Sequence, residues 1–146
     1  MKKFKFTILL ILIILPLKVY ALIEVDITRG NLNPLPIAVS ALYSDKLTTD
    51  ALKKEINIDQ IGNEISLVIE NNLKATGLFN PLEKKAFLQK PDVAHLKPRF
   101  EDWSLIKAQA LITGKVEFKD DKVRVEFRLW DVLAAREMLA LAFTTV

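Results

Sequence analysis

The 146-residue sequence contains no cysteine, one histidine and four glycines, and each shortage excludes a class of function. Without cysteine there is no disulfide, no thiolate nucleophile and no cysteine-based metal site. A serine triad would have to use His95, but no Gly-x-Ser-x-Gly elbow accompanies it, so we interpret His95 as a solvated loop residue. The glycines are too scattered to build a phosphate-cradling loop. One histidine and no cysteine leave only carboxylates as metal ligands, so no metal or cofactor site is expected.

Acidic side chains gather on or near one predicted helix, where paired carboxylates could act as acid and base. They are Glu55, Asp59, Glu64 and Glu70. We interpret them as the solvent face of that helix and not as paired catalytic acids. The sequence therefore predicts a binding module and no enzyme.

The first 21 residues have the organisation of a secretory signal peptide. Lysines precede an uncharged apolar run from Phe6 to Leu17, and Val19 and Ala21 supply the −3 and −1 residues. The alternative is an uncleaved anchor, but a helix over this run is about 18 Å long, short of the roughly 30 Å hydrocarbon core. We therefore predict cleavage between Ala21 and Leu22, export of the mature chain, and membrane contact only through the signal.

Removal of this signal changes the charge of the chain. Four of the 21 basic residues lie in it and none of the 18 acidic ones, so the mature part has 17 basic and 18 acidic residues, a net charge of −1. Nucleic-acid binding requires a basic surface. No nucleic-acid partner is therefore expected. No small-molecule substrate is expected either, because the sequence offers no catalytic constellation.

The strongest helical pattern lies between Asn57 and Thr76. Its apolar residues follow the three- and four-residue spacing of one helix face, and they are Ile58, Ile61, Ile65, Val68, Ile69 and Leu73. Asn57 or Asp59 can cap the first turn, and Gly77 fits the left-handed position that ends many helices. Gly62 either permits close packing against a sheet or is a tolerated weak point. A second, short helix is expected over Arg99–Lys107, with Phe100, Trp103, Leu105 and Ile106 partly buried.

Alternating or continuous apolar runs predict the strands. Near the N-terminus they cover Ile23–Thr28, Leu35–Leu42 as an interior strand, and an extended Leu78–Leu82. Towards the C-terminus they cover Ala108–Lys119, Lys122–Val132 and Met138–Val146. Asp120 and Asp121 predict a tight turn between the first two of these, and the last three strands are expected to form an antiparallel meander. Ser44–Lys54 is predicted to be a loop.

Together these elements predict an α/β (α+β) fold. We expect a two-layer sandwich in which a mixed sheet of about five strands has two helices on one face. Trp103 and Trp130 are expected to be buried, although exposure of one at a contact surface is the alternative.

Several stretches, in order, carry a resemblance to a known family. They are IEVDITRG at Ile23, LPIAV at Leu35, NNLKATGLFNPL ending at Leu82, PRFEDW at Pro98, AQALITGKVE at Ala108 and VEFRLWDV at Val125. Together they cover nearly all of the mature chain, and they resemble the N-terminal domain of the TolB family, periplasmic proteins of the Tol-Pal envelope system.

The resemblance implies a non-enzymatic adaptor that supports outer-membrane integrity, cell division and colicin or protein import. It implies binding to TolA, an inner-membrane protein, through the segment after signal cleavage. The residues of that segment are Leu22, Ile23, Glu24, Val25, Asp26, Ile27, Thr28, Arg29, Gly30, Asn31, Leu32 and Asn33. An N-terminal strand at a sheet edge can detach or add to a partner sheet. The alternative is that Ile23–Thr28 is a permanent strand of the domain, and both hold if the partner shifts a population.

Three features depart from the family. The chain stops at Val146, where the family continues through a further helix into a β-propeller, so we expect residues 22–146 to be a fragment that binds the lipoprotein Pal only if a propeller is present. Ser40-Ala41-Leu42 stands where Pro-Phe is frequent. Ala134-Ala135 stands where glycine is usual, which predicts a longer or looser hairpin. The alternative function is an accessory α/β binding module of another envelope-assembly or secretion system.

Overall fold

A computed structural model describes residues 33–44, 57–119 and 122–145. Four predicted features lie outside these ranges, wholly or in most of their length. They are the signal peptide, the strand Ile23–Thr28, most of the loop Ser44–Lys54 and the turn at Asp120 and Asp121. Within them the strands are β1 (Leu35–Val39), β2 (Tyr43–Ser44), β3 (Phe79–Pro81), β4 (Ala110–Lys119), β5 (Lys122–Asp131) and β6 (Arg136–Thr144). The helices are α3 (Ile58–Ala75), the 3₁₀ turn η1 (Lys84–Ala86), α4 (Pro91–Ala94) and α5 (Phe100–Leu105).

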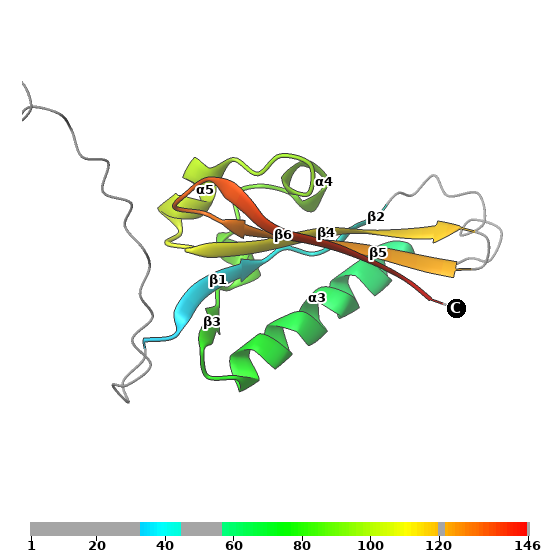
Figure 1. Cartoon of the computed structure of the whole chain (residues 1–146), viewed down its shortest axis with the longest axis horizontal. Coiled ribbons are helices and arrows are strands. Elements are labelled where there is room, and N and C mark those ends of the chain that lie inside the picture. Colours follow the sequence, from blue (N-terminus) through cyan, green and yellow to red (C-terminus); the bar gives the residue numbers. More distant parts are fainter. Residues whose placement is uncertain (1–32, 45–56, 120–121, 146) are drawn as a thin grey trace, which may run out of the picture. The chain divides into compact units, whose positions relative to one another are not determined.

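The described strands form one mixed sheet of six strands, ordered β3-β1-β4-β5-β6, with β2 pairing to β4 (Figure 1). β1 runs parallel to both β3 and β4, which confirms its predicted interior position. β4, β5 and β6 pair antiparallel, which confirms the predicted meander. The mixed α/β class is therefore confirmed.

Helix α3 has the predicted ends. The side chain of Asn57 accepts a hydrogen bond from the backbone N–H of Gln60 at 3.1 Å, so Asn57 is the N-cap. Gly77 has a φ of 72° after the C-cap Thr76, in the left-handed region that glycine adopts without a Cβ penalty. After Gly77 the chain enters β3, so it returns to the sheet as expected.

The helices cover both faces of the sheet, which corrects the expectation of two helices on one face. Ile61 and Ile65 of α3 pack in a cluster with Leu42, Val116 and Phe118. A second cluster, on the opposite face, joins α4 and α5 to the sheet. Its buried residues are Ala38, Ala94, Trp103, Ala108, Leu111, Trp130 and Val132. The described ranges hold three α-helices, one more than expected.

Strand order explains this arrangement. The connection through α3 leads from β1 to its neighbour β3, and the connection through α4 and α5 leads back across β1 to β4. Parallel crossovers are almost always right-handed, so two crossovers in opposite directions place their helices on opposite faces. Figure 1 shows α3 on one side of the sheet and α4 with α5 on the other.

A buried glutamine fixes the α5 layer. The Oε1 of Gln89 accepts hydrogen bonds from the backbone N–H of Arg99 at 2.9 Å and from Nε1 of Trp103 at 3.0 Å. Its Nε2 donates to the carbonyl of Lys97 at 3.3 Å. Since Gln89 and Trp103 are both buried, these bonds satisfy polar groups that would otherwise be costly to remove from water.

Two sequence expectations about the C-terminal half need correction. Leu105 is 73% exposed and not partly buried, because it ends a six-residue helix. β6 begins at Arg136, two residues earlier than predicted. The longer hairpin is confirmed: residues 132–135 form the turn, and Ala135 has a φ of 51°.

Candidate binding surface

Most of the predicted TolA-binding segment lies outside the described residues. Of Leu22 to Asn33, only Asn33 is described, and it is exposed. Just after it, the backbone N–H of Leu35 donates to the carbonyl of Leu78 at 2.8 Å and starts β1 beside β3. The cleavage site at Ala21 and Leu22 and the binding role of this segment therefore stay predictions.

His95 is not the solvated loop residue that we expected. It forms the C-cap of α4, is half-buried, and stacks on the ring of Tyr43 with 4.4 Å between centroids. Its Nδ1 lies 3.2 Å from the carbonyl of Pro91. The stack holds α4 against β2, so His95 has a structural role here.

The tryptophans and the acidic residues also have structural environments. Trp103 and Trp130 are both buried, as predicted, and Nε1 of Trp130 donates to Oγ1 of Thr113 at 2.8 Å. Glu64 is exposed, as predicted, but Glu70 is half-buried and pairs with Nζ of Lys84 at 3.2 Å.

Asp59 accepts a hydrogen bond from the hydroxyl of Ser44 and thereby links α3 to β2. Glu55 lies outside the described residues. Within the three described ranges, no group of histidine, aspartate and glutamate side chains could hold a metal ion.

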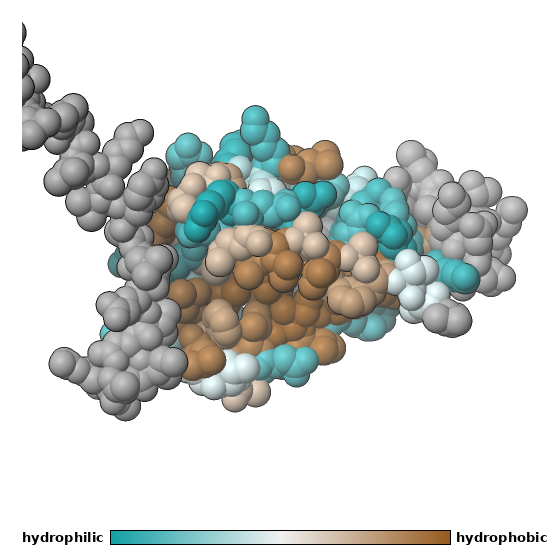
Figure 2. All heavy atoms as spheres, viewed as in Figure 1, coloured by the Kyte–Doolittle hydropathy of each residue, from teal (hydrophilic) through white to brown (hydrophobic). Residues whose placement is uncertain are grey.

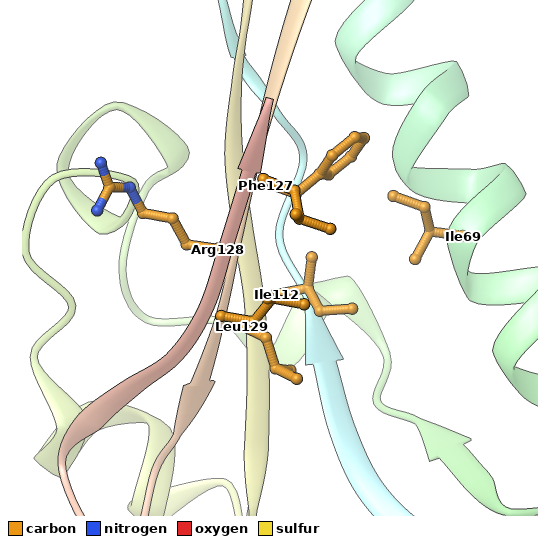
Figure 3. Close-up of a pocket in the computed structure, with 7 residues that line it drawn as sticks. Ile69, Ile112, Phe127, Arg128 and Leu129 are labelled. Atoms are coloured by element: carbon orange, nitrogen blue, oxygen red, sulfur yellow. The ribbon is translucent and has the colours of Figure 1, made fainter. Parts of the chain in front are cut away.

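The clearest surface feature is an apolar groove of about 280 Å³ beside α3. We call it the β6 groove. The residues that line it are Ile69, Ile112, Phe127, Arg128, Leu129, Leu139 and Leu141. In Figure 3, Ile69 points from α3 towards Phe127, while the side chain of Arg128 points to the other side of the sheet. There Arg128 pairs with Glu137 at 2.7 Å. Only apolar side chains therefore face the groove.

The β6 groove is open to solvent. Leu139 and Leu141 are 49% and 47% exposed, and Phe143, next on the same side of β6, is 58% exposed. Figure 2 shows these residues' face as a continuous hydrophobic area next to α3. Large contiguous apolar patches on a protein surface mark sites of interaction with proteins, ligands or membranes.

α3 packs chiefly on β1, β2, β3 and β4. On β5 it reaches the cluster that includes Val125 and Phe127, while β6 beside it is exposed along its length within the described residues. Two strands span roughly 10 Å, and helices pack side by side at about 8–10 Å. One more helix of suitable polarity would therefore fit on β5 and β6 next to α3.

Sequence reasoning found the residues of the groove but not their exposure. Phe127 and Leu129 lie on the predicted strand Lys122–Val132, and they are only half-buried. One signal for this exposure was available in the sequence, because it predicts three long apolar strands but only one long helix to cover them.

No helix in the part of the chain that the structure describes has both the length and the apolarity to cross a membrane.

Comparison with known proteins gives the family. The chain is 68% identical over 137 residues to "Tol-Pal system protein TolB" of Pelagibacter ubique (strain HTCC1062), covering 94% of this chain but 31% of that protein. The chain thus spans about a third of the length of this curated relative.

Solved structures agree on the fold. TolB from Acinetobacter baumannii superposes with a TM-score of 0.53 at 17% identity, over 75% of this chain and 22% of that chain. The LpoB C-terminal domain from Escherichia coli gives 0.54 at 11% identity, over 81% of this chain and 87% of that chain. Residues 23–138 match the family described as the TolB amino-terminal domain, and the chain belongs to that family.

Proposed function

We propose that this chain acts in the Tol-Pal system as a periplasmic, non-enzymatic adaptor module. The observation that carries the proposal is the 68% identity to a Tol-Pal system protein over 94% of the chain. The predicted signal peptide, residues 1–21, supports export to the periplasm. In this role the module would contribute to outer-membrane integrity, cell division and protein import.

The described residues support a binding role in place of catalysis. His95 is held in a stack with Tyr43, and Glu70 is held in an ion pair with Lys84. These contacts join elements of the scaffold, α4 to β2 and α3 to η1. An adaptor needs a stable scaffold and a contact surface, and both are available here.

The TolA contact that we propose lies in Leu22–Asn33. Ile23, Val25 and Ile27 alternate with polar residues, a pattern that suits pairing with a partner's sheet edge through backbone hydrogen bonds. Leu35 anchors the segment's C-terminal side, because its N–H is fixed on Leu78 at the start of β1.

We further propose that residues 22–146 correspond to the N-terminal domain of a longer protein. The comparison supports this, because the chain spans only 31% of the Tol-Pal system protein to which it is 68% identical. Binding to a Pal-like lipoprotein is part of the proposal only where a propeller follows this domain.

The experiment is a calorimetric titration of the exported chain with the C-terminal domain of TolA from the same bacterium. We expect saturable binding, and loss of at least about tenfold in affinity, or 1.4 kcal/mol, when residues 22–33 are deleted. A matched control substitutes Leu105 by serine, an exposed position on α5 that is remote in sequence from this segment. Unchanged affinity after the deletion would show that the segment is assigned wrongly.

A further inference from the structure

The outer edge of β6 is open along its whole length within the described residues. β6 is the last strand of the sheet, and no described element pairs with its outer side. The opposite edge is β3, which has three residues and ends at Pro81. Proline and short length are common protections against edge pairing. β6 has nine residues and contains no proline.

The residues of β6 that present free backbone groups follow from its pairing with β5. The N–H of Thr145 donates to the carbonyl of Val123 at 2.9 Å. In an antiparallel pair, successive residues direct their N–H and C=O groups to opposite sides. Leu139, Leu141 and Phe143 therefore bond to β5, while the backbone groups of Ala140, Ala142 and Thr144 point outward.

Charge along the strand selects the kind of partner. Residues 138–145 carry no charge, and the charged Arg136 and Glu137 stand together at the start of the strand. Glu137 is already paired with Arg128. An antiparallel copy of β6 brings no like charges into opposition, because each charged end lies beside the neutral end of the other copy. A charged segment from elsewhere would find no complement on this edge.

We propose that the outer edge of β6 pairs antiparallel with β6 of a second copy of this chain, around a two-fold axis at Leu141. In this register Ala140 of one copy bonds to Ala142 of the other. Leu141 then faces its symmetry mate, and Leu139 faces Phe143 of the second copy. These are the non-hydrogen-bonded pairs, whose side chains approach most closely.

The side chains match on both faces of the joined sheet. Leu139, Leu141 and Phe143 form one apolar row that meets its own copy, so each half-exposed side chain loses contact with water. On the other face, the small side chains of Ala140 and Ala142 oppose each other without a clash. An interface of this kind is isologous, since the same residues serve both partners.

The buried area makes the pair weak. Three half-exposed apolar side chains on each copy cover on the order of a few hundred Å² per partner, below the roughly 800 Å² per partner of stable complexes. The dimer is therefore transient and concentration-dependent. It is independent of the TolA contact, which we place in residues 22–33.

The decisive experiment uses the absence of cysteine as a zero background. In the exported chain, Leu141→Cys places two thiols on the proposed axis, where Cα atoms of a non-hydrogen-bonded pair lie about 4.5 Å apart, within disulfide range. Phe143→Cys places its two thiols four residues apart along the paired strands, roughly 13 Å. Leu105→Cys is a control with equal or greater exposure away from β6.

Under mild oxidation at equal protein concentration, we expect Leu141→Cys to form covalent dimers at least about tenfold faster than either control variant. Equal rates for all three variants, or no dimer in Leu141→Cys, would overturn the proposal. A second measurement removes the outward donor with Ala142→Pro, using Ala142→Val, which keeps the N–H, as its control. Sedimentation equilibrium should show weaker self-association for Ala142→Pro than for the unsubstituted chain, and unchanged self-association for Ala142→Val. Undiminished association of a folded Ala142→Pro would point to contact through the β6 groove and would refute edge pairing.

Discussion

The substitution Gly62→Ala tests how closely α3 lies on the sheet. A Cβ at this position would be 2.5 Å from the backbone oxygen of Leu42 and 3.4 Å from its carbonyl carbon. The first of these distances is far inside van der Waals contact. Leu42 cannot move aside easily, because its side chain is buried against Val116 and Phe118 and its N–H lies 3.4 Å from the carbonyl of Gly62.

Two opposing terms decide the sign of the effect. Replacing glycine by alanine inside a helix stabilises it by about 0.8–1.0 kcal/mol. Forcing an extra methyl group into a packed contact typically costs about 1–3 kcal/mol. Because the obstructing atom is in the backbone, we place the cost at the upper end of this range. The expected net result is a destabilisation of roughly 1–2 kcal/mol.

Urea unfolding followed by circular dichroism measures the free energy of unfolding. The matched control is Asn71→Ala, an exposed position in the C-terminal half of α3, where helix propensity alone should raise stability by about 0.5 kcal/mol. A Gly62→Ala protein that is as much stabilised as the Asn71→Ala protein would refute the close contact between α3 and Leu42.

Three further predictions concern single residues in the second half of the fold. Ala135→Gly should raise the free energy of unfolding by about 1 kcal/mol, because Ala135 has a φ of 51°, and thermal unfolding measures this gain. Gln89→Leu should lower the free energy of unfolding by about 2–4 kcal/mol in urea, because it leaves the N–H of Arg99 and Nε1 of Trp103 without their acceptor. Leu141→Ser should lower the fluorescence of bound anilinonaphthalene sulfonate, because Leu141 lines the exposed β6 groove.

Each of these has a matched control. Ala134→Gly changes the neighbouring residue of the same turn, which does not have a positive φ, and should not stabilise the protein. Gln60→Leu removes an exposed side chain with one side-chain partner and should change stability by less than about 0.5 kcal/mol. Leu105→Ser removes an exposed leucine outside the groove, and equal loss of dye fluorescence in that variant would contradict the groove assignment.

Local sequence signals predicted the elements that depend on local contacts. The ends of α3 followed from Asn57 and Gly77, because a cap and a left-handed glycine act within one turn. The meander followed from alternation in neighbouring segments. The face covered by α4 and α5 did not follow, because it depends on the reversal of strand order around β1. Helices of four and six residues carry too little periodicity to indicate a face.

The environments of single side chains depend on partners that are distant in the chain. The stack between His95 and Tyr43 joins residues more than fifty positions apart, so the sequence did not indicate it. His95 was therefore expected in a solvated loop. The ion pair between Glu70 and Lys84 was also hidden, because Lys84 lies beyond β3 in the chain. Glu70 was therefore expected on a solvent face. The β6 groove could not be predicted, because the sequence does not show how many of the six strands one helix covers. The TolA-binding segment came from family resemblance, and no described contact bears on it.

In the proposed role, the chain binds a TolA-like protein through residues 22–33 while the sheet serves as a scaffold. The most direct measurement is a titration of the isotope-labelled exported chain with the unlabelled C-terminal domain of TolA, followed by amide chemical shifts. We expect the largest changes in residues 22–33 and smaller ones at the start of β1, with the amides of β4 and β5 unchanged. Changes confined to the sheet or to the β6 groove, or no changes at saturating TolA domain, would contradict the account.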